Sequence, residues 1–286
     1  MNLKTNGLLM ELLLETAIFL ATAFTIGAVG NIAGIGGGVL LMVVLLFVFK
    51  MNPVLAGGFS LLTIIASTAA GSVFNAKAKA IDKRIFHVLA IAAGTGAVVG
   101  SVASYFIAIG TFDLAFGFTS LSLGIFSLAA TRIETWKNKG KAYLKQSFNE
   151  YRVAGGVLAT PGAGYGTGAV SLIAGILAGL FGIGIGAVMG TFLTAIRRIN
   201  PKTAFSTVVA AMIITSAVGA TTHFLKPGLD VSSMVLAIPL VIGGALGGLL
   251  GAYISARISF VALRSFQGYV IIAFGLLAIA MSLAGA

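Results

Sequence analysis

Two glycine-rich runs are the residues whose type and spacing best suit the binding of a small molecule. Where a helix restarts inside a membrane, its first turn presents N–H groups without intrahelical partners and the positive end of the helix dipole. Glycine lets an anion approach that backbone closely, so the runs predict a site for an oxyanion. The alternative is that the glycines only allow helices to pack closely. The residues concerned are Gly34, Ile35, Gly36, Gly37 and Gly38 in the first run and Gly182, Gly184 and Gly186 in the second.

Hydroxyl groups follow each run at helical spacing. Two Asn-Pro pairs, Asn52-Pro53 and Asn200-Pro201, are typical of helix starts, because Asn caps a helix and Pro suits its first turn. The hydroxyls nearest these starts are predicted to donate to the bound oxyanion, although they can instead bond to a carbonyl of their own helix. They are Ser60 and Thr63 in the first helix and Ser206 and Thr207 in the second.

Asn75 and His223 occupy corresponding positions near the far ends of those two helices. A neutral histidine can titrate near physiological pH, so His223 is a candidate for proton coupling or for a gate at the mouth of a pathway. The alternative is a polar anchor at the membrane surface.

The composition places these residues in a membrane protein. Of 286 residues, 58% are hydrophobic and only 9% are charged, with a mean hydropathy of +1.09. A soluble domain carries about a quarter of charged residues, so a cytosolic enzyme, a nucleic-acid-binding domain and a disordered regulator are excluded. The chain has no cysteine, which excludes disulfides and thiolate chemistry.

Charge-free runs predict an all-α, polytopic fold. A bilayer core needs about 20 helical residues, and six of the runs fit one crossing each. Two others, 16–49 and 153–196, are too long for one crossing and must fold back at their glycine runs, which are therefore expected to interrupt helices. Ten segments follow, near 12–30, 36–49, 53–75, 85–108, 112–131, 168–181, 184–197, 201–224, 231–256 and 264–285.

A shift of 148 residues reveals an internal repeat. It aligns 27–75 with 175–223 without a gap and makes 12 of the 49 positions identical. Because each half has five segments, the second half must enter the membrane from the opposite side, which gives inverted topology. We expect a first repeat at 1–131, a basic connecting loop at 132–152 and a second, inverted repeat at 153–286.

The charges indicate the orientation. The loops after the third, fifth, seventh and ninth segments carry 15 of the 18 basic residues. By the positive-inside rule these loops, 132–152 included, are cytoplasmic and both termini are outside the cell membrane. The net charge of +11 is therefore a signal of topology rather than of nucleic-acid binding. The N-terminal stretch is not typical of a cleaved signal peptide, so the first helix is expected to remain.

The sequence predicts neither an enzyme nor a cofactor. It has no cluster of metal-ligating residues, no phosphate-binding loop of an ATPase and no nucleophile–base pair at a recognisable spacing. Short apolar segments interrupted by glycine at matching places in two halves are typical of a transporter site. Because the sequence has no ATP-binding element, such a transporter is expected to draw on the proton motive force.

The motifs resemble those of the TauE/SafE sulfite exporter family of membrane permeases. The resemblance rests on Gly34–Gly38 with its degenerate repeat, on the Asn-Pro-x-x-Ala helix start, and on Ala56-Gly57-Gly58-Phe59-Ser60, which looks like the family's Ala-x-Gly-Thr-Ser pattern. Ala204–Val208 is a looser version of that pattern, and His223 resembles a histidine that often follows it in the family. Ile185 departs from the motif by replacing a glycine, so the two half-sites need not contribute equally.

The resemblance covers essentially the whole chain and implies a helical, inverted-repeat transporter. Its expected substrate is a sulfur-containing or organic anion such as sulfite or an organosulfonate, bound at the membrane midplane and exported. A passive anion channel, a transporter of a different small anion and a membrane-bound scaffold or enzyme subunit remain as alternatives.

Overall fold

The structure, a computed structural model, describes residues 3–76, 81–138, 163–227 and 231–285, and the regular structure within these ranges is all helical. Among these residues, eight helices are long and apolar enough to cross a membrane. Two shorter apolar helices, Gly38–Val48 and Gly186–Ile196, follow the two glycine runs. The prediction of an all-α, polytopic membrane protein with short helices at the glycine motifs is confirmed.

The helix bounds lie close to the predicted segments. The helices are α1 Leu3–Ile32, α2 Gly38–Val43, α3 Pro53–Ala76, α4 Lys83–Ala103, α5 Ile109–Asn138, α8 Ala163–Phe181, α9 Gly186–Thr191, α10 Pro201–Phe224, α11 Ala237–Ser255 and α12 Phe260–Leu283. The short helices α2 and α9 continue into π-helical turns at Val44–Val48 and Phe192–Ile196. Because α5 continues to Asn138, it takes up the start of the predicted connecting loop, of which 139–152 lie outside the described residues.

The backbone repeats itself at the offset of 148 residues found in the sequence. Positive φ angles occur at Gly34 and Gly36 and again at Gly182 and Gly184, 148 positions later. The two non-glycine residues with positive φ show the same relation, Lys50 with φ 50° and Arg198 with φ 54°. The two π-helical turns are related in the same way. The internal repeat is therefore a repeat of conformation as well as of sequence.

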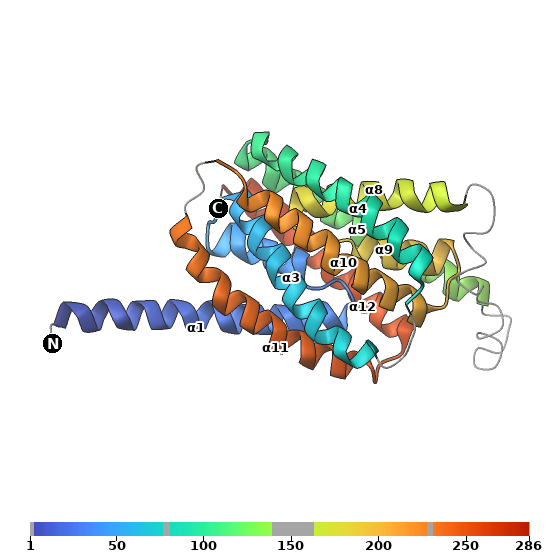
Figure 1. Cartoon of the computed structure of the whole chain (residues 1–286), viewed down its shortest axis with the longest axis horizontal. Coiled ribbons are helices and arrows are strands. Elements are labelled where there is room, and N and C mark those ends of the chain that lie inside the picture. Colours follow the sequence, from blue (N-terminus) through green and yellow to red (C-terminus); the bar gives the residue numbers. More distant parts are fainter. Residues whose placement is uncertain (1–2, 77–80, 139–162, 228–230, 286) are drawn as a thin grey trace.

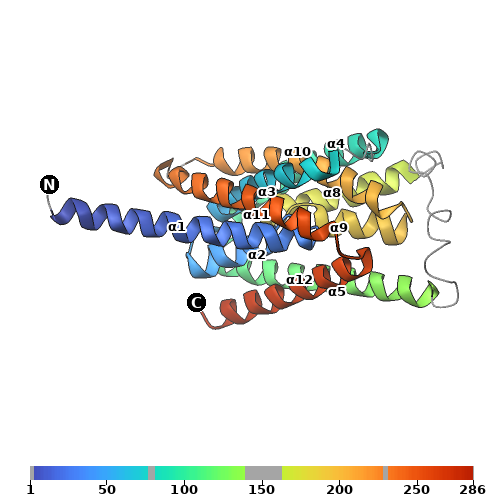
Figure 2. The same cartoon turned by 90° about the horizontal axis from the view of Figure 1, so that it is seen from below.

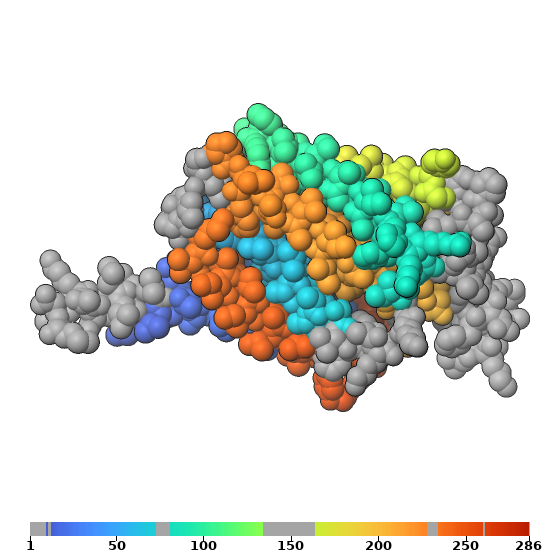
Figure 3. All heavy atoms as spheres, in the orientation of Figure 1, coloured from blue at the N-terminus to red at the C-terminus, as the bar shows by residue number. Residues whose placement is uncertain are grey.

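Six long helices form a continuous row in the order α1, α11, α3, α10, α4, α8, each contacting the next. Figure 1 shows the central helices of this row, and Figure 3 shows α3 exposed between α10 and α11 on one face. The order is symmetric about the contact between α3 and α10. Helix α1 of the first half packs against α11 of the second, and α8 of the second half packs against α4 of the first. The two halves therefore interlock.

Helices α5 and α12 form a pair along another side of the molecule, as Figure 2 shows. This pair contacts the short helices, since α12 packs against α2 and α5 packs against α9. The interrupted segments therefore lie between the row and the pair, in the interior of the bundle. The N-terminal end of α1 and the C-terminal end of α12 lie toward the same end of the molecule (Figures 1 and 2).

Glycine allows the closest helix contacts. A Cβ atom on Gly100 of α4 would lie 2.0 Å from the carbonyl oxygen of Ile176 in α8. The contact between α11 and α1 is as close, because a Cβ on Gly247 would lie 2.0 Å from the carbonyl oxygen of Phe24. No side chain fits at such distances, so these glycines act in close packing, as small residues do in membrane bundles.

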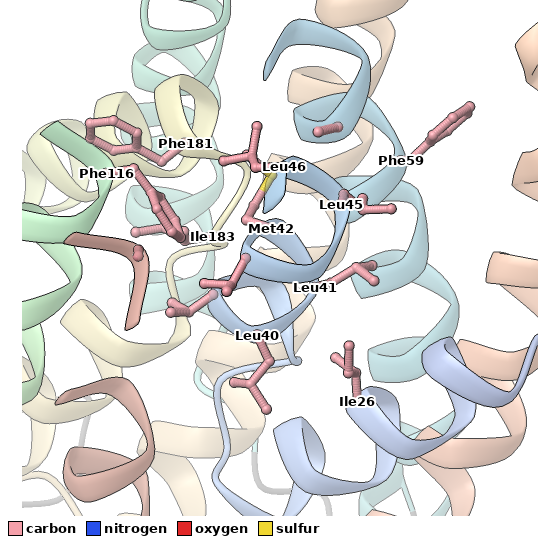
Figure 4. Close-up of a cluster of buried hydrophobic side chains, with 14 of the residues drawn as sticks. Ile26, Leu40, Leu41, Met42, Leu45, Leu46, Phe59, Phe116, Phe181 and Ile183 are labelled. Carbon is pink, nitrogen blue, oxygen red and sulfur yellow. The ribbon is translucent and has the colours of Figure 1, made fainter. Parts of the chain in front are cut away.

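The short helix α2 is held by apolar contacts on several sides. Leu40, Leu41, Met42 and Leu45 are buried in one cluster with Ile183 of the second glycine run. Figure 4 shows these side chains pointing toward α1, α3 and the second run. Burying an aliphatic side chain is worth about 1.5–3 kcal/mol relative to exposure to water. In the membrane interior, the same contacts fix the position of the interruption through close packing.

Candidate functional site

The first interruption is a tight turn that ends α1 and starts α2. The N–H groups of Ile35 and Gly36 donate to the carbonyl oxygen of Gly30, at 2.9 and 3.2 Å. The turn requires the left-handed backbone of Gly34, Gly36 and Gly37, which have φ angles of 72°, 71° and 87°. The first intrahelical bond of α2 runs from Leu41 N–H to the Gly37 carbonyl, at 3.0 Å. The N–H groups of 38–40 precede that bond and are the donors left for a ligand.

The second interruption repeats two of the three positive φ angles of the first. Gly182 and Gly184 again have positive φ, 65° and 71°. Ile185, at the position of Gly37, has φ −86° and ψ −4°, a right-handed conformation that does not require glycine. The degenerate motif therefore has a conformational reason. The first bond of α9 runs from Met189 N–H to the Ile185 carbonyl, so the N–H groups of 186–188 precede it.

The two interruptions meet inside the bundle. A Cβ atom on Gly38 would lie 2.8 Å from the carbonyl oxygen of Gly182, and one on Gly186 would lie 2.9 Å from that of Gly34. These contacts exchange under the offset of 148 residues, as a pseudo-two-fold axis between the halves requires. We call the place where they meet the junction, defined by Gly34–Gly38 and Gly182–Gly186, and all ten residues except Gly34 are buried.

Two apolar side chains lie at the centre of the junction. A Cβ atom on Gly36 would be 3.2 Å from Ile64 Cγ2 and from Met212 Cε, and one on Gly184 would be 3.1 Å from Met212 Sδ. Ile64 of α3 and Met212 of α10 are related by the 148-residue offset, and both are fully buried. Neither residue has an unusual type for a membrane helix, so the sequence gives no sign of this pair.

Hydroxyls of α3 bind the junction through its carbonyl groups. Ser60 Oγ donates to the Gly182 carbonyl at 2.6 Å and lies 3.4 Å from that of Gly38. Ser67 Oγ, which was not among the predicted site residues, lies 3.2 Å from the Gly36 carbonyl. Ser60 thus lies at the junction, and its hydroxyl hydrogen is donated to the protein backbone.

The other predicted hydroxyls lie elsewhere. Thr63 Oγ1 donates to the Phe59 carbonyl at 2.8 Å, and its methyl group faces Gly244 of α11. Thr207 Oγ1 donates to the Thr203 carbonyl at 2.7 Å and accepts from Asp82 N–H at 3.0 Å. Ser206 is buried in α10. The hydroxyls of Thr63 and Thr207 therefore each donate to a carbonyl of their own helix, which was the alternative to binding an oxyanion.

His223 lies in the interior and is separated from the junction by the backbone of Gly57. Its Nε2 atom is 2.7 Å from the Gly179 carbonyl, and its side chain is fully buried. The imidazole covers Gly57, where a Cβ atom would lie 2.9 Å from Nε2. Gly57 in turn contacts Gly182, whose Cβ would lie 2.9 Å from the Gly57 Cα. A buried ring does not fit the alternative of a surface anchor. The side chain of Asn75 lies outside the described residues.

The comparisons with known proteins agree with this architecture. Residues 19–281 match the family described as Sulfite exporter TauE/SafE. The chain is similar to the "Probable membrane transporter protein YunE" of Bacillus subtilis (strain 168), with 26% identity over 211 residues that cover 70% of this chain and 75% of the relative. No solved structure matches the chain significantly. Because the family match extends over nearly the whole chain, including both interruptions, the protein belongs to the TauE/SafE sulfite exporter family of membrane transporters.

Proposed function

We propose that the protein is a secondary transporter that exports a small sulfur-containing or organic anion, such as sulfite or an organosulfonate, across the cytoplasmic membrane. The observation that carries the proposal is the reciprocal contact of the two interruptions at the junction. Broken helices that meet between repeats are where transporters of this general design bind their substrates. The family description supports an anion of the sulfite type.

The junction offers the anion two helix starts. The N–H groups of 38–40 and 186–188 precede the first intrahelical bonds of α2 and α9, and the helix dipoles add positive potential there. An oxyanion between the two starts would accept from both. The side chains of Ile64 and Met212 fill the space between Gly36 and Gly184, so the anion displaces them when it binds. The described arrangement is then an occluded form of the transporter.

Alternating access follows from movement of the interlocked halves around the junction. The pairs α1–α11 and α8–α4 join segments from different halves, so each pair can move as one body. Protons are the proposed coupling ion, and His223 is the proposed coupling residue because it is buried one layer from Gly182. The basic loops face the cytoplasm in this proposal, with both termini outside.

A passive channel is the second candidate, and the packing at the junction favours the transporter. A channel needs a continuous wet pore when open, whereas Ile64 and Met212 are fully buried between the interruptions. Flux that saturates with substrate concentration supports a transporter. Electrical conductance that rises without saturation would support the channel.

The test uses flux of labelled sulfite and of a sulfonate into proteoliposomes. Gly36→Val and Gly184→Val each place a side chain beside Met212 at a positive φ, and we expect each to reduce flux by about a hundredfold, since about 3 kcal/mol of strain falls on the junction. Gly110→Val is the matched control, because a Cβ there meets no atom within 4 Å. Flux that survives both junction variants would contradict the backbone site.

The substrate itself is identified by thermal shift of the purified protein. Sulfite, sulfate, thiosulfate and several sulfonates are compared, since a ligand that binds only the folded state raises the unfolding temperature. The proposal expects a selective rise with a sulfur-containing anion. An equal response to all anions would point to a different substrate.

A further inference from the structure

A second group of buried polar side chains lies away from the junction, on α5, α9 and α12. Four of its atoms are buried and have no hydrogen-bond partner among the described residues: Ser120 Oγ, Ser127 Oγ, Thr191 Oγ1 and Gln267 Nε2. Each of these side chains is at most 1% exposed. A buried polar atom without a partner costs about 1–3 kcal/mol. Four of them within one region indicate that something else satisfies them.

The packing of the helices brings these groups to one region. A Cβ atom on Gly268 of α12 would lie 2.5 Å from Leu128 Cγ of α5, so the neighbouring residues Gln267 and Ser127 lie at the same level. Helix α5 also packs against α9, which carries Thr191. Figure 2 shows α5 and α12 running side by side. The group therefore stands where the helix pair faces the interior.

A positive charge belongs to the same face. Arg264 precedes Gln267 by three residues on α12, a spacing that places both on one side of a helix. Arg264 is 1% exposed and lies within the candidate membrane span Val261–Leu283. A charged side chain inside a membrane is costly and usually marks the path of a substrate or ion.

The face continues toward the junction. Ser127 and Ser120 are seven residues apart on α5, so they share one side of the helix, and Phe116 follows one turn further. The Phe116 ring packs against the ring of Phe181, with centroids 5.9 Å apart. Phe181 is the residue directly before Gly182. Figure 4 shows Phe116 beside Phe181 and Ile183. The side of α5 that carries Ser127 and Ser120 thus continues, at Phe116, to the residue that precedes the second interruption.

We propose that Arg264, Gln267, Ser127 and Thr191 form a second anion site, which holds the transported oxyanion before it reaches the junction. The guanidinium, the amide NH2 and the hydroxyls are all hydrogen-bond donors, the set that suits a small oxyanion such as sulfite. Arg264 lies in the first turns of α12, so this site is near one end of the α5–α12 pair. In the proposed function, that end faces the cytoplasm. The inference rests on the proposed anion transport.

The test measures the concentration dependence of sulfite uptake by Gln267→Leu and Ser127→Ala. Each variant removes one donor without adding a charge, and we expect KM to rise about tenfold with kcat nearly unchanged, because the site at the junction is intact. Gln267→Glu adds a negative charge beside Arg264 and is expected to raise KM further. Ser122→Ala is the matched control on α5, since the Ser122 hydroxyl is exposed and bonds within its helix.

Sulfite binding to purified protein separates this inference from the proposed function. In a Gly36→Val background, transport is expected to be about a hundredfold slower while sulfite still binds. Adding Gln267→Leu is expected to weaken this remaining binding about tenfold. Wild-type KM and wild-type sulfite affinity in both Gln267→Leu and Ser127→Ala would overturn the second site while transport stands. A wild-type protein that transports no tested anion would instead overturn the proposed function. If Gln267→Leu fails to fold, Ser127→Ala decides alone.

Discussion

The two interruptions share a backbone path but have different surroundings. Gly34 faces an aromatic ring, because a Cβ atom there would lie 2.8 Å from Phe205 Cε1 of α10. At the equivalent place in the other half, Gly182 faces the backbone of Gly57 on α3. Phe205 and Gly57 are related by the 148-residue offset, so one half has a large side chain where the other has none.

Polar groups fill the space that Gly57 leaves. The imidazole of His223 covers Gly57, and the hydroxyl of Ser60 donates to the Gly182 carbonyl at 2.6 Å. The residue equivalent to Ser60 is Val208, a buried apolar side chain that cannot donate. Gly182 of the second interruption therefore has polar groups close by, namely the Ser60 hydroxyl and, behind Gly57, His223, whereas Gly34 of the first is backed by an apolar ring. Duplication has kept the positive φ angles at Gly34 and Gly36 and at their equivalents Gly182 and Gly184, and the side chains have made the two half-sites unequal.

The largest expected effect comes from Gly37, where the two backbones differ in φ. Gly37→Ala forces a side chain into the left-handed region at φ 87°, 2.9 Å from the carbonyl oxygen of Ile26. We expect a loss of about 3 kcal/mol in stability, from left-handed strain of about 1–2 kcal/mol together with overpacking. Ile185→Val, at the equivalent helical position, is expected to cost about 1 kcal/mol. Thermal unfolding in detergent measures both, and equal losses would contradict the conformational difference.

An intermediate effect is expected from His223→Asn, which installs the residue of the first half at this position. An amide can still donate to the Gly179 carbonyl, but it does not titrate. We expect the acceleration of anion flux by an imposed pH gradient to fall about tenfold, with substrate binding retained. His87→Asn is the control, because His87 is exposed on α4. Full acceleration in His223→Asn would remove His223 from the coupling mechanism.

The smallest effect is expected from Ser60→Ala, which gives the second interruption the apolar surroundings of the first. The change removes the hydrogen bond to the Gly182 carbonyl. Hydrogen bonds between membrane helices are worth about 0.6–1.7 kcal/mol, so we expect a stability loss of about 1 kcal/mol and slower flux. Ser72→Ala on the same helix is the control, since that hydroxyl is exposed and bonds to the Ala69 carbonyl. A stability loss no larger than that of Ser72→Ala would show that Ser60 does not hold the junction together.

Local signals in the sequence predicted the elements well. The Asn-Pro pairs start α3 and α10, where Asn52 Oδ1 accepts from Val54 N–H at 3.0 Å and Asn200 Oδ1 accepts from Lys202 N–H at 2.9 Å. The glycine runs interrupt their helices as predicted. Caps and positive φ angles involve only neighbouring residues, so the sequence carries them directly.

The direction of side chains within the bundle was harder to predict. Thr63 was a candidate donor and contacts α11, whereas Ser67 was passed over and contacts the Gly36 carbonyl. A helix stripe of hydroxyls spans a wide arc, and only its packed neighbours decide which hydroxyl reaches a given backbone group. Arg264 shows the same difficulty, because a charge near the end of a segment can face a loop or the interior.

The sequence by itself determined the membrane class, the ten segments, the duplication and the two interruptions, because hydropathy, charge spacing and glycine chemistry act along the chain. Only the tertiary structure decided that the interruptions touch, that Ile64 and Met212 lie between them, and that Arg264 and Gln267 face inward. These features depend on contacts between residues more than a hundred positions apart. Such contacts are fixed by how interlocked helices pack, which no single segment encodes.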